Sequence, residues 1–183
     1  MKESLLITGF KPFLSNEINP SELLIEKLEK LGYNCLLLDV SYQEADEKIN
    51  QDYLSKLGIR KILSFGLAAS REQMTIEEFA YNEINQKTKD NRQFIPSSSF
   101  IVEGGKETLR TSYNPDYLVN MLNKEGFQAS LSADPGRYLC NYVYYKSLEA
   151  LAGSALFVHL PPMRKPTDLD NYLSAALLLI KDL

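Results

Sequence analysis

A cysteine in the C-terminal half of the chain is placed where a thiol can act as a nucleophile. Cys140 lies in GRYLCNYVYY, in the first turn of a predicted helix that follows Pro135 and Gly136. The first turn of a helix carries unpaired backbone N–H groups and the positive end of the helix dipole. This position is expected to lower the thiol pKa below its free value of about 8.5. A free cysteine that fills space in the core is the equally weighted alternative.

The sequence contains one histidine, which could serve as the base for such a thiol. His159 ends the apolar run ALFVHL and precedes Pro161 and Pro162. The prolines end the predicted strand, since proline cannot donate a hydrogen bond to a sheet. Alone, a histidine in this position is more often a satisfied, half-buried side chain. Together with Cys140 it favours a Cys–His pair, which requires only that the two side chains meet in the folded protein.

A third group usually orients the imidazole in sites of this kind. The stretch MTIEEFAYN supplies Glu77 and Glu78 in an apolar, extended context. Successive side chains of a strand point to opposite faces, so one carboxylate must point into apolar surroundings or a cleft. The pattern does not decide which one. In the alternative reading, one acid pairs with Arg71 and the other faces water.

Strand-like and helical patterns alternate along the chain. Strands are expected at residues 4–8, 34–40, 60–65, 73–82, 127–132 and 155–160. Helices are expected at residues 20–31, 43–57, 116–124, 138–151 and 168–183. Residues 83–115 form a long, polar and irregular segment. The alternation predicts an α/β fold in one domain over residues 1–183, a three-layer α/β/α sandwich around a twisted, mostly parallel (mixed) sheet.

The predicted topology places the chemically suggestive residues at one edge of the sheet. In open α/β sheets, sites lie beyond the carboxyl ends of the strands. Four segments follow predicted strands, at residues 9–13, 66–71, 134–140 and 159–162. Cys140 and His159 are therefore expected to meet there.

Composition excludes several other classes of function. The net charge of −4 and the lack of a Lys/Arg run argue against nucleic acid or an anionic membrane as the main partner. The short apolar run before Gly9 favours a cytoplasmic protein. Cys35 is expected in the core, and two separated cysteines with one histidine favour neither a disulfide framework nor a metal site. Phosphate-binding glycine motifs do not follow any predicted strand, so no cofactor is expected.

Four sequence blocks together resemble the signatures of a known family. In chain order, GFKPF…INPS, GLAASREQMTIEEFAYN, GRYLCNYVYY and FVHLP look like those of the pyrrolidone-carboxylate peptidases (pyroglutamyl peptidase I), which are cysteine peptidases. The blocks span Leu6 to Pro161. The cysteine block is the most specific, because DPGRYLCN nearly meets the family pattern small–Gly–x–aromatic–aliphatic–Cys–Asn.

The resemblance implies an activity and a set of site residues. Cys140 would be the nucleophile, His159 the base and Glu77, rather than Glu78, the acid. The enzyme would remove an N-terminal pyroglutamyl residue from peptides without a cofactor, and it would form a homo-oligomer. The residues implied to bind the substrate are Phe10, Phe13, Asn19, Leu67, Tyr138, Leu139 and Lys87.

The sequence departs from the family pattern at several positions. Leu67 replaces a glutamine, Lys87 replaces an arginine, and Ala69–Ser70 and Leu14–Ser15 replace Gly–Gly pairs. Lysine cannot supply the planar fork of arginine. These changes are expected to alter substrate choice or rate rather than to abolish the nucleophile. Two alternatives follow: a diverged member that hydrolyses another small amide, or a non-catalytic binding protein on the same scaffold.

Overall fold

A six-stranded sheet forms the centre of the computed structural model, which describes residues 4–13 and 18–183. Its strands are β1 (Leu5–Phe10), β2 (Cys35–Leu38), β3 (Lys61–Leu67), β4 (Met74–Glu77), β7 (Ala129–Ser132) and β8 (Ala155–Leu160). Their order is β2-β1-β3-β8-β4-β7. The first four in this order are mutually parallel, whereas β4 pairs antiparallel with β8 and β7 pairs parallel with β4. The expected mixed, mostly parallel sheet is confirmed.

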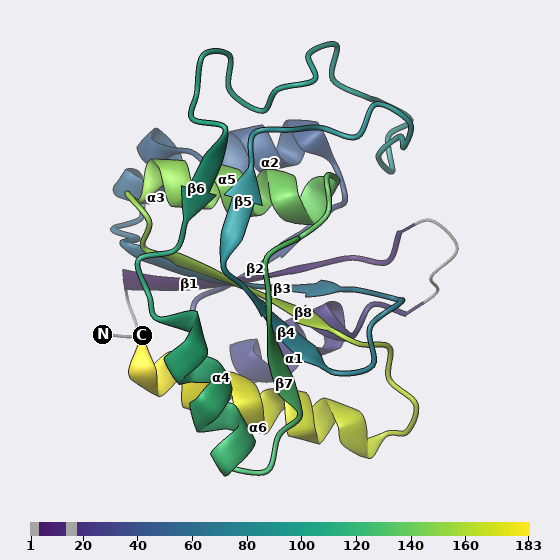
Figure 1. Cartoon of the computed structure of the whole chain (residues 1–183), viewed down its shortest axis with the longest axis vertical. Helices are drawn as coiled ribbons and strands as arrows, with labels where there is room; N and C mark the ends of the chain where they lie inside the picture. Colours follow the sequence, from purple (N-terminus) through teal and green to yellow (C-terminus); the bar gives the residue numbers. More distant parts are fainter. Residues whose placement is uncertain (1–3, 14–17) are drawn as a thin grey trace.

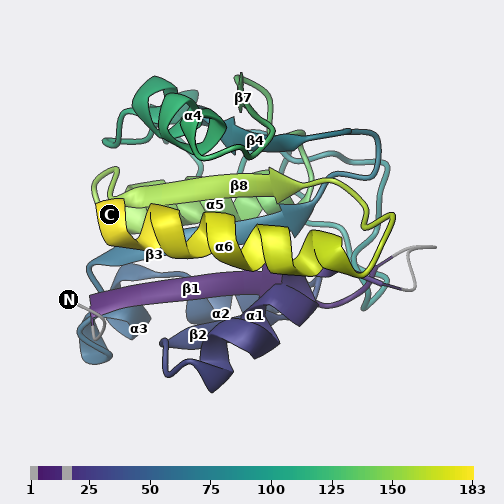
Figure 2. The same ribbon diagram turned by 90° about the horizontal axis from the view of Figure 1, so that it is seen from below.

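Helices cover both faces of this sheet, which confirms the three-layer arrangement (Figure 1). One face carries α1 (Pro20–Lys30), α4 (Pro115–Lys124) and α6 (Thr167–Asp182), and the other carries α2 (Tyr42–Lys48), α3 (Gln51–Lys56) and α5 (Leu139–Ala150). From below, α6 lies across the central strands, with α1 and α4 on either side of it (Figure 2). Each face has its own apolar cluster, so the sheet is buried on both sides. Each of the described helices is too short or too polar to cross a lipid bilayer.

The expected helix over residues 43–57 is wrong in one respect, because two helices occupy this region. The helix α2 ends at Lys48, and Ile49 is its C-cap. The side chain of Asn50 accepts a hydrogen bond from the N–H of Tyr53 to start α3. Asparagine is a strong N-cap residue, since its short side chain replaces a missing intrahelical acceptor. An asparagine inside a polar helical pattern was therefore the signal for a break.

The expected extended segment over residues 73–82 is also divided, because the chain leaves the main sheet at Glu78. It continues as β5 (Phe79–Tyr81), which pairs antiparallel with an unpredicted strand, β6 (Thr108–Arg110). The long loop between them lies over the α2–α5 side of the molecule (Figure 1). The buried carboxylate of Asp90 fixes this loop by accepting hydrogen bonds from the backbone N–H groups of Tyr42, Arg92 and Phe94.

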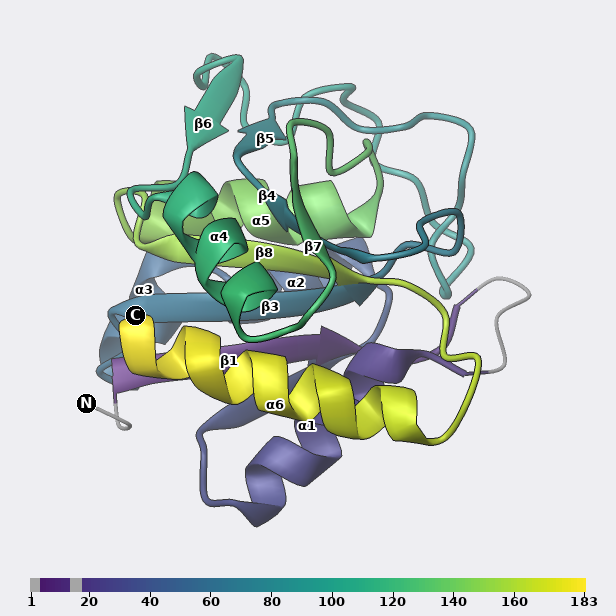
Figure 3. The same cartoon turned by 60° about the horizontal axis from the view of Figure 1, so that its bottom comes forward.

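The direction of β7 corrects the expected convergence of four segments at one edge. Residues 9–13, 66–71 and 159–162 follow parallel strands, but β7 runs antiparallel to β8. Residues 133–138 must therefore turn back before α5 begins (Figure 3). The start of α5, and not the end of β7, is what brings Cys140 toward the ends of β3 and β8.

Candidate active site

The imidazole of His159 contacts a fully buried carboxylate. In the antiparallel pairing of β4 with β8, Thr75 lies opposite His159, and Glu77 lies two residues further along. The Nδ1 atom of His159 is 2.7 Å from Oε1 of Glu77, whose side chain is completely buried. An ionised carboxylate only accepts hydrogen bonds, so Nδ1 carries the proton and Nε2 remains able to accept one.

The neighbouring acid, Glu78, has a different partner. Glu78 lies where the chain leaves β4, and its carboxylate pairs with Arg110 of β6 at 2.8 Å. The structure therefore brings Glu77, and not Glu78, to His159. Alternation along the strand separates the two side chains, as the sequence pattern requires.

The carboxylate of Glu77 is held in its ionised form. Burial is the largest influence and raises its pKa, but other groups together lower the pKa below its ordinary value. These are the hydrogen bond and charge of His159, a hydrogen bond from Ser132 and the charge of Arg71. An opposite charge and donated hydrogen bonds both favour a carboxylate over the neutral acid.

A glycine in β3 makes room for the thiol beside this pair. A Cβ atom at Gly66 would lie 3.0 Å from Sγ of Cys140 and 2.9 Å from the ring of Phe157. Gly66 is the β3 partner of His159 in the sheet register, and the rings of Phe157 and His159 are 4.8 Å apart. The thiol, which α5 supplies, and the imidazole therefore lie on the same face of the sheet, over the neighbouring strands β3 and β8. Sequence reasoning missed this role of Gly66, although a glycine inside a strand is a known sign of close approach.

The thiol is not a preformed thiolate, which contradicts the expected low pKa. Burial, followed by the negative charge of Glu77, raises the pKa of Cys140 to about 12, against the opposing charge of Arg71 and the backbone N–H of Cys140 itself. The helix start does not outweigh desolvation here. The thiol proton must therefore pass to a base as the sulfur attacks.

The start of α5 offers backbone donors beside the thiol. Side chains cap α1, α2, α3 and α4, whereas Tyr138 at the start of α5 makes no side-chain capping bond. Backbone N–H groups in the first turn have no intrahelical acceptor. They can donate to an oxygen that becomes negative during acyl transfer. Among the described residues, no group of three or more His, Cys, Asp or Glu side chains is arranged to hold a metal ion.

Comparisons with known proteins identify the family to which this site belongs. The family model described as pyroglutamyl peptidase (Peptidase_C15) matches residues 3–171. The chain belongs to this family of cysteine peptidases. The family resemblance seen in the sequence blocks is thus confirmed.

Relatives and solved structures cover nearly the whole chain. The chain is similar to human pyroglutamyl-peptidase 1, with 30% identity over 178 residues, 93% of this chain and 84% of the relative. It is 34% identical to the pyrrolidone-carboxylate peptidase of Halalkalibacterium halodurans over 90% of this chain and 87% of the relative. The crystal structure of pyrrolidone carboxyl peptidase from Thermus thermophilus matches with a TM-score of 0.87 at 29% identity, covering 98% of this chain and 100% of that one.

Four of the residues expected to bind substrate lie around the start of α5. Phe10 is buried with its ring 6.3 Å from that of Phe157, and the ring of Phe13 is 6.1 Å from that of Tyr138. Leu139 is buried and directly precedes Cys140. Phe13, Tyr138 and Cys140 pack against the apolar cluster that contains Phe10 and Phe157. A lactam pocket formed by these residues stays a prediction.

The other three expected binding residues are placed differently. Asn19 is fully buried and caps α1, accepting from the backbone N–H of Ser21, so its side chain supports the loop instead of facing a ligand. Leu67 follows Gly66 in β3, and alternation directs its side chain to the face opposite the thiol. Lys87 is exposed on the loop between β5 and β6. The Leu14–Ser15 departure lies outside the described residues.

Proposed function

We propose that this protein removes N-terminal pyroglutamyl residues from peptides as a cysteine peptidase. The contact between Glu77 and His159, on the face where Cys140 packs against Gly66, is the observation that carries the proposal. This set contains a nucleophile, a base and an orienting acid. The family match and the names of the relatives support the same reaction and substrate class.

Acylation begins when Sγ of Cys140 attacks the carbonyl carbon of the pyroglutamyl residue. As the C–S bond forms, the thiol proton passes to Nε2 of His159, and the carbonyl oxygen becomes an oxyanion. Backbone N–H groups at the start of α5 donate to that oxyanion. The C–N bond then breaks, and the imidazolium of His159 protonates the leaving amine. The product of this half-reaction is a thioester on Cys140.

Deacylation reverses these roles. A water molecule attacks the thioester while His159 takes its proton, and the C–S bond breaks with return of that proton to the sulfur. Pyroglutamate leaves with the water oxygen in its new carboxyl group. Throughout, the carboxylate of Glu77 remains ionised, holds the imidazole in one tautomer and stabilises the imidazolium without accepting its proton.

The aromatic side chains near the start of α5 suit a neutral ring. Phe13 and Tyr138 offer apolar area, and burying an uncharged lactam against them would supply affinity without the cost of desolvating a charge. A free N-terminal glutamate carries charges that these side chains do not match. The proposal therefore includes preference for the cyclised residue.

Hydrolysis of a pyroglutamyl anilide by the purified protein tests the proposal. Release of aniline by the wild type, and its loss in Cys140→Ser with an unchanged circular dichroism spectrum, is the expected result. Equal turnover by both proteins would refute the assignment. The departures at Leu67 and Lys87 favour a second candidate, a diverged member that cleaves another small amide, and a panel of other aminoacyl anilides separates the two.

Two further expectations belong to this proposal. The protein is expected to act in the cytoplasm and to self-associate. Fractionation of the cells that make the protein tests the first expectation. Analytical ultracentrifugation tests the second, with a single species at the monomer mass contradicting it.

A further inference from the structure

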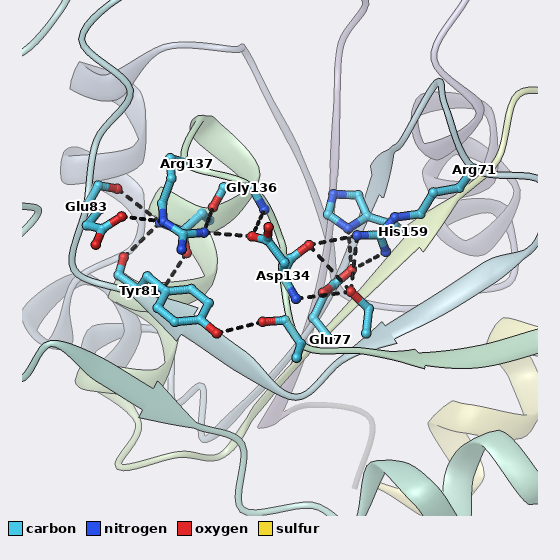
Figure 4. A network of polar contacts seen from close by, with 11 residues as sticks. Arg71, Glu77, Tyr81, Glu83, Asp134, Gly136, Arg137 and His159 are labelled. Carbon is cyan, nitrogen blue, oxygen red and sulfur yellow. Dashed lines mark hydrogen bonds and ion pairs between the residues drawn. The ribbon is translucent and has the colours of Figure 1, made fainter.

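The side chain of Arg71 reaches two parts of the site at once. Its backbone N–H bonds to the carbonyl oxygen of Ala68 in a turn between β3 and β4. Its Nη1 atom contacts Oε1 of Glu77 and Oγ1 of Thr75. Its Nη2 atom donates to Oγ of Ser132 at 3.1 Å and to the carbonyl oxygen of Asp134 at 2.8 Å. Figure 4 shows the guanidinium between the acid and the turn.

At the first of these contacts, Arg71 and His159 meet on the same oxygen. Oε1 of Glu77 lies 2.7 Å from Nδ1 of His159 and also contacts the guanidinium of Arg71. The other oxygen, Oε2, is buried and has no hydrogen-bond partner among the described residues. Any movement of the guanidinium therefore changes the one oxygen that orients the imidazole.

At the second contact, Arg71 holds the turn that precedes the nucleophile. The carboxylate of Asp134 also accepts from Nη1 of Arg137 at 2.7 Å. Arg137 in turn lies 3.9 Å from the ring centre of Tyr81 and pairs with Glu83 at 2.5 Å (Figure 4). The turn is thus tied to the main sheet by Arg71 and to β5 and its following loop by Arg137. Three residues after Arg137, the chain reaches the thiol.

We propose that Arg71 is a positioning residue that holds Glu77 beneath His159 and fastens the turn leading to Cys140. The proposal rests on the proposed function, because it assigns Arg71 a part in the same reaction. Arginine suits this part, since its planar fork can serve two acceptors on different segments at fixed angles.

The charge of Arg71 acts in the same direction on both titratable groups it faces. It lowers the pKa of Glu77, alongside His159, and it opposes the effects of burial and Glu77 that raise the pKa of Cys140. Removing the charge therefore raises both pKa values. Glu77 must be ionised to orient the imidazole, so the acid limb of the activity profile moves to higher pH. Alkylation of the Cys140 thiol likewise moves to higher pH.

A purely structural arginine would behave differently. Its loss would lower the free energy of unfolding without moving the pH dependence of the thiol or of turnover. Arg110 supplies a matched control, since it pairs with Glu78 at 2.8 Å but contacts neither His159 nor the turn among the described residues.

The experiment compares Arg71→Gln, Arg71→Lys and Arg110→Gln in a Cys35→Ala background, which leaves Cys140 as the only thiol. Turnover of pyroglutamyl anilide and the rate of alkylation by iodoacetamide are each measured against pH. We expect Arg71→Gln to lose kcat by about 10²-fold, as misplacement of a reacting group does. KM should change less, and both pH profiles should move to higher pH. Arg71→Lys should keep the acid limb of the parent's activity profile but not its full kcat. Arg110→Gln should have the same kcat and the same pH profiles as the parent.

Each outcome decides the proposal. If Arg71→Gln has the kcat and both pH profiles of Arg110→Gln, Arg71 is not a positioning residue. If Arg71→Gln does not fold, Arg71→Lys decides, and an undiminished kcat in that variant overturns the proposal. If the parent does not cleave the anilide, the proposed function fails, while a shifted alkylation profile in Arg71→Gln still supports its part at the thiol and an unshifted one overturns it.

Discussion

Two neighbouring glutamates with arginine partners show how position decides the role of a side chain. Glu77 is 0% exposed and pairs with Arg71, whose side chain is 23% exposed. Glu78 is 17% exposed and pairs with Arg110, whose side chain is 58% exposed. One pair lies under an imidazole, and the other fastens the small β5–β6 sheet to the end of β4.

The difference between these pairs is one of surroundings and not of chemistry. A single residue along a strand reverses the direction of the side chain, and the strand ends between the two acids. Glu77 consequently exchanges water for His159 and Arg71, which lower its pKa against the effect of burial. Catalytic sites are typically formed where burial and specific partners act together on one group.

The largest effect is expected when the partner of Glu77 is removed. His159→Ala leaves the thiol of Cys140 without a base, so turnover of pyroglutamyl anilide should fall by about 10⁴-fold. Steady-state kinetics measures this loss, and circular dichroism checks that the fold is retained. Turnover within about tenfold of wild type would show that another group accepts the thiol proton.

The next effect separates the two acids directly. Glu77→Gln should lower kcat by about 10²- to 10³-fold, because an amide can donate to Nδ1 and favour the wrong tautomer of His159. Glu78→Gln should leave kcat within about twofold, since its partly exposed ion pair with Arg110 does not involve His159. Kinetics on both variants at the same pH makes the comparison. Equal losses would mean that neither acid orients the imidazole.

A third effect concerns stability as the pH falls. The pKa of Glu77 is lowered in the folded protein, so its ionised form stabilises the fold above the pKa of the unfolded chain. That stabilisation is lost as the pH falls through the folded pKa. Urea unfolding of wild type and Glu77→Gln, from about pH 7 to about pH 3, should show the difference between them shrinking with acid. A difference that stays constant over this range would contradict the lowered pKa.

The smallest effect is expected at the partly exposed pair of Glu78 and Arg110. A double-mutant cycle of Glu78→Gln and Arg110→Gln should give a coupling energy of about 0.2–1 kcal/mol in the free energy of unfolding. Urea unfolding at neutral pH measures each corner of the cycle. A coupling energy of several kcal/mol would indicate that the Glu78–Arg110 pair is shielded from water as fully as the Glu77–Arg71 pair.

The sequence was sufficient for the fold class and the family. Alternating strand and helix patterns predicted the three-layer sandwich, since each buried strand and amphipathic helix carries its own signal. The family blocks selected Glu77 where strand alternation alone left Glu78 open. The structure then placed Glu77 against the imidazole of His159.

The features that escaped prediction depend on tertiary structure. The antiparallel insertion of β4 and β7 leaves no mark on the pattern of either strand, so the expected route to Cys140 was wrong. The low pKa expected for Cys140 was also wrong. The helix dipole follows from the local sequence, but the burial that raises the pKa depends on the whole fold. The contacts of Arg71 join three segments, and no spacing along the chain encodes them.

The most direct measurement is mass spectrometry of the protein quenched during turnover of pyroglutamyl anilide. We expect a pyroglutamyl adduct on the peptide that contains Cys140, absent from Cys140→Ser. Steady hydrolysis with no adduct on Cys140, continuing in Cys140→Ser, would contradict the account.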